Sequence, residues 1–389
     1  MSAPWQSASS TPILDSGLLP QPRRKNTILG FLFGLLVGVL FILVVLRAGT
    51  QDQSETALFS YFGVLFLAVI IHELGHLFMG WIVGFHFNSI ALGPIVFGFE
   101  YGKLTIRLRR GTGLLGHAGI QVDRVMRLRH RFLLFIIGGP TASLVSAAVA
   151  AFLIKCVFSK SWLVPVSAGY AYLSLLIGSA GFLPLWPKSR SDGSRMWMLL
   201  TSREKTRRLI STLALLHQTK LGIPLKLWKK TWLNATTAVR DDSFDEFTSN
   251  WIAFCAASAR KDVPKLTAHL ERCLELASVL PDAKRDEIAR EAGIYVAWFR
   301  NDAGAAEKWF AQRKYSNQTT RIMQIRMKVA LDCARRDFAS SFKGIEEGAN
   351  IIESLPNTPY REVLRESWRE WQDELTKKQS QLVRTSQLE

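Results

Sequence analysis

Long apolar runs separated by short polar segments fill the chain to about residue 186, and frequent charges follow from about residue 188. An uninterrupted apolar run covers residues 28–46, and three more cover about residues 57–85, 132–158 and 162–186. A helix needs about 20 apolar residues to cross the hydrocarbon layer of a bilayer. The pattern therefore predicts four transmembrane helices in a membrane domain at residues 27–194.

The other segments are predicted from their polar composition. Residues 1–26 are rich in Ser, Pro and Gln, which is typical of a disordered segment. Residues 195–377 show the periodicity of amphipathic helices, which predicts a soluble α-helical domain. The polar residues 378–389 are expected to form a flexible tail. The predicted fold class is an all-α membrane protein with a cytoplasmic helical domain after its last span.

The formal net charge is +17, and many of the cations lie next to apolar runs. They gather before the first predicted span, between the second and third, and after the fourth. Short cytoplasmic loops carry the excess of Lys and Arg, so both termini are predicted to be cytoplasmic, on a plasma or inner cell membrane. A basic balance also occurs in nucleic-acid-binding proteins, but the sequence shows no nucleic-acid module. The lipid bilayer is therefore the expected partner, and nucleic acid is not.

The four cysteines, Cys156, Cys255, Cys273 and Cys333, show neither CxxC spacing nor a paired histidine. Their spacing argues against a zinc knuckle and against a disulfide framework. We expect thiols in a reducing compartment.

The segment His72-Glu73-Leu74-Gly75-His76 lies inside the second predicted span. Two histidines four residues apart share one helix face, about one turn apart, where both can reach one Zn²⁺. Glu73 points about 100° away around the axis and can reach a water molecule rather than the metal. Ionisable groups in hydrocarbon cost several kcal/mol unless they are paired or bind something. A metal centre is therefore favoured over a surface helix that carries these residues by chance.

A catalytic zinc needs a third protein ligand and an open position. The fourth predicted span ends in a proline-broken segment that leads to Asp192 and Gly193. Irregular backbone at membrane depth is tolerated where it lines a polar cavity. An Asp-Gly pair after proline is by itself a turn signal, so Asp192 becomes the candidate ligand only together with the histidines.

Over about residues 57–200, these motifs resemble the site-2 protease family of intramembrane zinc metalloproteases. That family carries HExxH in one core helix, Gly-Pro in the middle core helix, and Asp-Gly near a third. Gly139-Pro140 and Asp192-Gly193 match this pattern, whereas Gly181 and Ser143 stand where asparagines are usual.

The resemblance implies an endopeptidase that cuts a membrane-protein substrate within or beside a transmembrane segment. His72, His76 and Asp192 would hold Zn²⁺, and Glu73 would act as general base on zinc-bound water. A membrane protease with Glu as third ligand is disfavoured, because no Glu lies in a comparable setting near the later spans. The departures at Gly181 and Ser143 motivate a different class, a catalytically degenerate scaffold whose helical domain binds a protein partner.

Residues 89–109 predict a small β-hairpin after the second span. The turn signal Tyr101-Gly102 separates a glycine-punctuated stretch from an alternating one. In the resembled family, a β-structured element can pair with an unwound substrate by strand addition. The alternative is a membrane-surface hairpin held by Arg on phospholipid. The nearby His86, His117 and His130 are interpreted as surface or interfacial histidines rather than ligands.

Three segments of the soluble half each contain an apolar helix, a polar turn with Asp, and a second helix. Asp262, Asp302 and Asp337 mark these turns. The pattern resembles tetratricopeptide-type (TPR-like) helical hairpins and predicts a repeat domain with a partner-binding surface. A plain helical bundle without a partner is the alternative.

Overall fold

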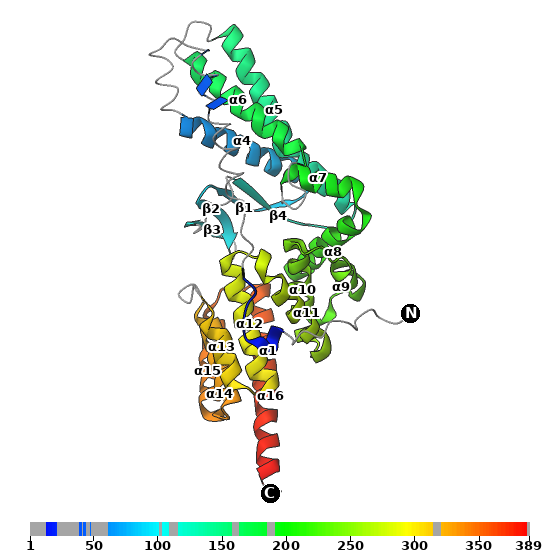
Figure 1. The fold of residues 1–389 in the computed structure, drawn as a ribbon, viewed down its shortest axis with the longest axis vertical. Coiled ribbons are helices and arrows are strands. Elements are labelled where there is room, and N and C mark those ends of the chain that lie inside the picture. Colours follow the sequence, from blue (N-terminus) through cyan, green and yellow to red (C-terminus); the bar gives the residue numbers. More distant parts are fainter. Residues whose placement is uncertain are drawn as a thin grey trace. The chain divides into compact units, whose positions relative to one another are not determined.

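The computed structural model describes residues 13–21, 61–100, 103–108, 116–157, 163–184, 191–313 and 320–386, together with isolated positions between 39 and 47 (Figure 1). Its internal contacts divide the chain into two units. Residues 24–217 form the membrane unit, and residues 1–23 with 218–389 form the helical unit.

Three helices of the membrane unit are long and apolar enough to cross a bilayer. They are α4 (Tyr61–Ile82), α5 (Leu128–Cys156) and α6 (Leu163–Phe182), and each contacts the other two. They coincide with the predicted spans at 57–85, 132–158 and 162–186. The predicted span at 28–46 falls almost entirely outside the described residues.

Glycines bring α4 and α5 into backbone contact. A Cβ on Gly75 would lie 3.0 Å from the carbonyl carbon of Gly138, and one on Gly138 would lie 2.7 Å from Cβ of Met79. Small residues permit such close approach between membrane helices. The contact holds α5 against the turn of α4 that carries His72 and His76.

A four-stranded antiparallel sheet lies between α4 and α5 in the sequence. Its strands are β1 (His86–Leu92), β2 (Ile95–Glu100), β3 (Lys103–Leu108) and β4 (Gly116–Gln121), in the order β3-β2-β1-β4. The predicted hairpin is confirmed as β2 and β3, whose register pairs Glu100 with Lys103. The prediction of a hairpin alone is wrong, because β1 and β4 complete a larger sheet. Glycines at 116 and 119 lower the strand propensity of β4, and β1 is interrupted by a bulge between Phe87 and Ser89.

One face of the sheet is apolar and packs on α4. Ile90 and Leu92 of β1 form a buried cluster with Val69 of α4. The same face extends to β3, where Leu104, Ile106 and Leu108 are 61%, 66% and 80% exposed. Their alternation with Thr105 and Arg107 gives β3 one apolar face and one polar face.

Arg131 joins the end of α4 to the start of α5. Its Nε donates to the Val83 carbonyl oxygen at 2.7 Å, and its Nη1 donates to the Arg124 carbonyl oxygen at 2.9 Å. Its Nη2 pairs with Asp123, and its guanidinium lies over the Phe85 ring. Burial would raise the pKa of Asp123, but the hydrogen bond and charge of Arg131 lower it.

Replacing Arg131 with Leu removes the donor for two carbonyl oxygens and for the Asp123 carboxylate. Removing one partner of a buried ion pair costs about 3–5 kcal/mol. Because the Asp123 side chain is 23% exposed, we expect the lower end of that range. Thermal unfolding in detergent measures the loss for Arg131→Leu. His130→Gln, at the exposed neighbouring position, is the control, and equal midpoints for the two variants would contradict the role assigned to Arg131.

α7 (Asp192–Thr201) and α8 (Arg203–Lys220) follow the three apolar helices, and the membrane unit ends at residue 217. Leu199 of α7 is 1% exposed and joins a cluster with Leu128 and Phe135 of α5. The sequence predicts a boundary near residue 195, where the periodicity of amphipathic helices begins. The packing extends the unit further, because the apolar residues of α8 cover the same cluster.

The helical unit consists of a series of helices that are mostly paired. They are η1 (Leu225–Leu227), α9 (Lys230–Thr237), α10 (Phe244–Ala259), α11 (Val263–Glu275), η2 (Leu276–Val279), α12 (Asp282–Arg300), α13 (Ala303–Ala311), α14 (Arg321–Ala334), α15 (Phe338–Ser354) and α16 (Pro359–Ser386). Helices α10 with α11, α12 with α13, and α14 with α15 contact each other as hairpins.

The three aspartates that mark the sequence pattern cap the second helix of each hairpin. Asp262, Asp302 and Asp337 accept hydrogen bonds from the backbone N–H groups three residues later. The residue before each aspartate adopts a positive φ, which closes the turn. The repeated pattern therefore encodes a repeated turn geometry. Asp and Asn favour such caps because their side chains satisfy the free N–H groups of a helix start.

The N-terminal segment docks on the helical unit. α1 (Ile13–Ser16) carries Leu14, which is 1% exposed. Trp309 Nε1 donates to the Leu14 carbonyl oxygen at 3.3 Å, and Leu19 N–H donates to Gln312 Oε1 at 2.7 Å. The predicted disorder of residues 1–26 is therefore wrong for residues 13–21, because their apolar side chains enter the core of the helical unit.

The C-terminal helix α16 continues to Ser386, so the predicted flexible tail at 378–389 is helical over most of its length. Lys378 Nζ donates to the Trp298 carbonyl oxygen at 2.7 Å and to Asn301 Oδ1 at 2.9 Å. These contacts attach the start of the predicted tail to α12.

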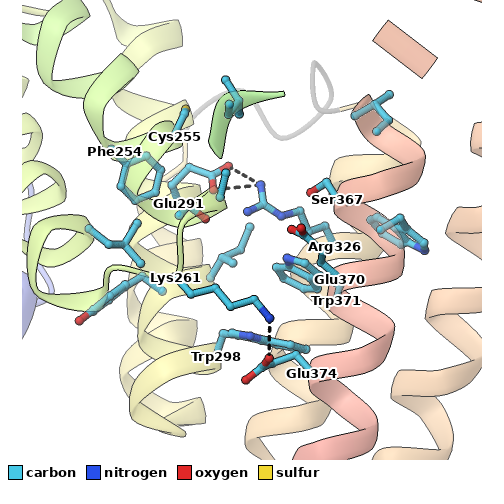
Figure 2. A pocket seen from close by; sticks show the side chains of 18 of the residues that line it. Phe254, Cys255, Lys261, Glu291, Trp298, Arg326, Ser367, Glu370, Trp371 and Glu374 are labelled. Carbon is cyan, nitrogen blue, oxygen red and sulfur yellow. Dashed lines mark hydrogen bonds and ion pairs between the residues drawn. The ribbon is translucent and has the colours of Figure 1, made fainter. Parts of the chain in front are cut away.

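A cavity of about 800 Å³ lies inside the helical unit, between α10, α12, α14 and α16 (Figure 2). Much of its wall is aromatic, including Trp251, Phe254, Tyr295, Trp298 and Trp371. Charged side chains cross it in pairs, Glu291 with Arg326 at 3.0 Å and Lys261 with Glu374 at 3.1 Å. In Figure 2 the pair Lys261–Glu374 joins the turn after α10 to α16, and the pair Glu291–Arg326 joins α12 to α14.

Candidate metal centre

α4 places His72 and His76 on one face, as the HExxH spacing predicts. The ring centroids lie 4.9 Å apart, and the residues His72 and His76 are 8% and 4% exposed. Asp192 comes from the first turn of α7, and its Oδ2 lies 3.0 Å from His72 Nε2 and 3.2 Å from His76 Nε2. The structure thus brings all three predicted ligands together, and their donor atoms lie within 4.8 Å of one another.

The separations of these donor atoms fit a small tetrahedral ion. Ligand bonds of about 2.0–2.1 Å in a tetrahedral site separate neighbouring ligand atoms by about 3.3–3.4 Å. The two nitrogen–oxygen separations, 3.0 and 3.2 Å, are close to that value. Two imidazoles and one carboxylate could therefore hold a metal ion and leave one coordination position open.

The second ring nitrogen of His76 is fixed by α5. His76 Nδ1 lies 2.9 Å from the Phe135 carbonyl oxygen, which is closer than the Gly139 N–H at 3.3 Å. An N–H at Nδ1 therefore donates to this carbonyl and leaves Nε2 free to act as a ligand. Pro140 has no N–H for the helical bond to Ile136, so the hydrogen-bond ladder of α5 is interrupted next to this turn.

The second ring nitrogen of His72 is fixed by Ser143. Ser143 Oγ lies 2.9 Å from His72 Nδ1, and the serine is fully buried. The hydroxyl oxygen can accept from Nδ1–H, which leaves Nε2 directed toward Asp192. Sequence reasoning noted Ser143 only as a departure from the resembled family. Ser143 follows Pro140 by three residues, which places the two residues on the same face of α5. This spacing is the sequence feature that could have predicted the contact with His72.

Asp192 is held by the start of α7 and by its neighbour Gly193. Ser191 caps the helix by accepting from Ser194 N–H. A Cβ on Gly193 would lie 2.5 Å from the Leu183 carbonyl carbon, so only glycine lets α7 start against the end of α6. Burial would raise the pKa of Asp192, but hydrogen bonds and charges from His72 and His76 lower it well below its usual range. The side chain is therefore an ionised ligand at neutral pH.

Glu73 points away from the histidines and toward β4, as its place in the motif predicts. It is 6% exposed, and the Ala118 backbone N–H hydrogen-bonds to its carboxylate. A Cβ on Gly116 would lie 2.8 Å from Glu73 Cδ, so the glycine makes room for the carboxylate. Glu73 Oε2 is buried and has no hydrogen-bond partner among the described residues. A buried oxygen of this kind is suited to accept a proton from a water molecule in the site.

Gly181 is the second departure from the resembled family, and the structure supplies its reason. A Cβ there would lie 2.7 Å from Pro140 Cγ and 3.5 Å from His72 Cε1. The volume that an asparagine side chain would need is filled by Pro140. The other candidates lie elsewhere: His86 opens β1, His117 lies in β4 and His130 lies in the first turn of α5, all exposed, as the sequence interpretation expected.

Comparisons with protein-family models, with curated proteins and with solved structures found no match to this chain.

Replacing Ser143 with Ala removes the group that orients His72. Loss of such an outer partner weakens metal binding by about 10–100-fold in comparable sites. We expect that loss for Ser143→Ala, measured by competition with a chromophoric chelator and Zn²⁺ as the probe. Ser174→Ala is the matched control, because Ser174 is equally buried but its Oγ has no hydrogen-bond partner among the described residues. A control that weakens binding as much as Ser143→Ala would remove the specific role of Ser143.

Replacing Gly139 with Ala places a methyl group 2.6 Å from His76 Cδ2. We expect His76 to be displaced and the Zn²⁺ affinity to fall by at least the factor expected for Ser143→Ala. Overpacking should also lower the free energy of unfolding by about 1–3 kcal/mol, which lowers the unfolding midpoint. Gly63→Ala in α4 is the control, because a Cβ there meets nothing within 4 Å. Wild-type affinity in Gly139→Ala would show that His76 does not need this close approach.

Proposed function

We propose that this chain is an intramembrane zinc endopeptidase. The observation that carries the proposal is the buried Glu73 carboxylate, with an unpartnered oxygen, one residue from a convergent His72–His76–Asp192 set. His72, Glu73 and His76 lie on a helix long and apolar enough to cross a membrane. A buried base beside metal ligands supports hydrolysis. A site inside such a helix supports a substrate that is itself in the membrane.

The donor set favours zinc. Two imidazoles and one carboxylate are a usual ligand set of a catalytic zinc, which keeps its fourth position open for water or substrate. The same ligand types also bind non-haem iron. Glu73 argues for zinc, because a general base next to the metal serves hydrolysis, whereas oxygen chemistry has no comparable need for it. HExxH on a single helix is the pattern of zinc hydrolases.

The chain's own residues supply orientation and proton transfer. Zn²⁺ bound here would acidify a water molecule and polarise the scissile carbonyl. Glu73 accepts the proton of the attacking water at Oε2 and returns it to the leaving amine. Ser143 and the Phe135 carbonyl hold the two imidazoles in their ligand tautomers. β4 lies against the Glu73 carboxylate, and the burial of this residue, which is 6% exposed, limits access of bulk water.

β4 is the edge strand of the described sheet beside Glu73, and it offers a place for an extended substrate. Within the described residues β4 pairs only with β1, and its first residue, Gly116, contacts Glu73. An extended peptide added to this edge would pass beside the general base. We therefore propose that the substrate strand adds to β4 rather than to the predicted hairpin. The exposed Leu104, Ile106 and Leu108 of the hairpin suit contact with lipid.

The contacts of the N-terminal segment support a fourth span. Residues 13–21 pack in the helical unit with residues after 218, so both lie on the same side of the membrane. Three crossings by α4, α5 and α6 would place them on opposite sides. An additional crossing between residues 22 and 60 resolves this, and the apolar run at 28–46 is the segment able to make it. Cytoplasmic termini on a plasma or inner membrane remain the proposal from the loop charges.

Two variants separate metal binding from proton transfer. Glu73→Gln should retain zinc but lose cleavage of co-expressed single-span test proteins by on the order of 10²–10⁴-fold, the usual contribution of a general base. Asp192→Ala should lose zinc as well as cleavage. Elemental analysis of the purified proteins and immunoblots of the test proteins provide the two measurements. Robust cleavage by Glu73→Gln would end the assignment of Glu73 as base.

A scaffold function is the second candidate, and the cavity of the helical unit favours it. Its volume of about 800 Å³ and its aromatic wall suit an apolar anchor side chain of a protein partner. The two functions are compatible, because the cavity and the metal centre belong to different units. Full zinc occupancy without proteolysis of any membrane test protein would favour the scaffold alone.

A further inference from the structure

The outer face of α7 is apolar, although the helix belongs to the charged half of the sequence. Trp197 and Leu200 are three residues apart on one helix face and are 58% and 56% exposed. Leu199, on the opposite side, is buried against α5. A short helix with one buried face and a second, exposed apolar face that carries a tryptophan is typical of a membrane interface.

The depth of α7 follows from its contact with α5. The 29 residues of α5 would extend about 43 Å, longer than the hydrocarbon layer of about 30 Å. Charged side chains avoid hydrocarbon, so we place its first turn, which carries the exposed Arg129 and His130, at the level of the lipid headgroups. Arg129 donates two hydrogen bonds to the Leu199 carbonyl oxygen, at 3.1 and 2.7 Å, and so holds the end of α7 at this level.

The start of α7 lies deeper than its end. Asp192 is seven residues before Leu199, about 10 Å along the helix, and it meets the histidines of α4. α7 therefore connects the lipid headgroup level with the candidate metal centre. A change at its outer end is transmitted along a rigid helix of two to three turns.

Cations surround the outer end of α7. Arg203 and Arg207 occupy the first turns of α8, four residues apart and exposed, and Arg127 is exposed just before α5. Over residues 193–208 there are five cations, Arg195, Arg203, Lys205, Arg207 and Arg208, against one acid, Glu204. Exposed Lys and Arg side chains are attracted to the anionic headgroups of a membrane surface.

We propose that Trp197 and Leu200, together with Arg203 and Arg207, form a docking surface for an anionic phospholipid headgroup layer, and that this docking holds Asp192 in the metal centre. The docking of this surface on lipid requires only that α4, α5 and α6 span a membrane. The positioning of Asp192 rests on the proposed metal site. A membrane rich in anionic lipid would then strengthen metal binding, and a neutral membrane would leave α7 freer to carry Asp192 away.

Lipid contact is tested with an environment-sensitive label at position 201, which shares the exposed face of α7. The full chain carries Thr201→Cys, with Cys156→Ser to remove the exposed native thiol. Burial raises the pKa of Cys255 to about 12 and also raises that of Cys273 and Cys333, so these thiols label slowly at neutral pH. The control label is Gln379→Cys on the polar helix α16. We expect several-fold stronger quenching at 201 by headgroup-level spin-labelled lipid, and equal quenching would overturn the docking surface.

Positioning of Asp192 is tested by Zn²⁺ affinity of the full chain in nanodiscs. Discs of phosphatidylcholine are compared with discs containing one third phosphatidylglycerol. We expect about tenfold tighter binding in the anionic discs, which corresponds to about 1.4 kcal/mol. Arg203→Gln with Arg207→Gln should abolish the difference. Lys230→Gln with Lys343→Gln removes the same charge from exposed positions of the helical unit and should preserve it.

The two measurements separate lipid contact by α7 from the positioning of Asp192 by lipid. Equal affinity in both discs for the wild-type chain would overturn the positioning of Asp192 by lipid. A lipid effect that survives Arg203→Gln with Arg207→Gln would also overturn it. Absence of Zn²⁺ binding in every disc would instead contradict the proposed metal centre, and the label at position 201 would still decide whether α7 docks on the membrane.

Discussion

Three ionisable side chains on one turn of an apolar helix impose the constraint on which the membrane unit depends. His72, Glu73 and His76 are each less than a tenth exposed, on a helix suited to hydrocarbon. Such groups are costly unless neighbouring groups satisfy them. Asp192 and Ser143 reach His72, the Phe135 carbonyl reaches His76, and β4 reaches Glu73.

The close approaches that satisfy this constraint explain why glycine recurs around the site. Gly75 and Gly138 bring α5 against α4, and Gly139 leaves the space that the His76 ring occupies. Gly116 does the same for Glu73, and Gly193 lets α7 begin against Leu183. In each place a methyl group would meet a ligand, the base or a backbone atom. The candidate metal centre is therefore specified as much by the absence of side chains as by His72, His76 and Asp192.

The sequence predicts the helices and the placement of His72 and His76 on one face well, because both depend on local pattern, whereas metal binding by these residues stays a prediction. HExxH sets the spacing of its two histidines through helical periodicity, and three of the four apolar runs in the sequence coincide with α4, α5 and α6. It predicts β2 and β3 through their turn, but not β1 and β4, whose pairing joins residues separated by the hairpin. It also misses Ser143, the docking of residues 13–21 and the extension of the membrane unit through α8. Each of these features depends on a contact between residues far apart in the sequence, such as Trp309 with Leu14, which the local hydrophobic pattern does not reveal.

The coordination of the bound metal tests the central claim most directly. X-ray absorption at the zinc edge, measured on the purified full chain, reports the ligand atoms without reference to any substrate. We expect two imidazoles and additional oxygen ligands at about 2.0–2.2 Å, with one oxygen ligand lost in Asp192→Ala. A thiolate ligand, a single imidazole, or a spectrum unchanged by Asp192→Ala would contradict it.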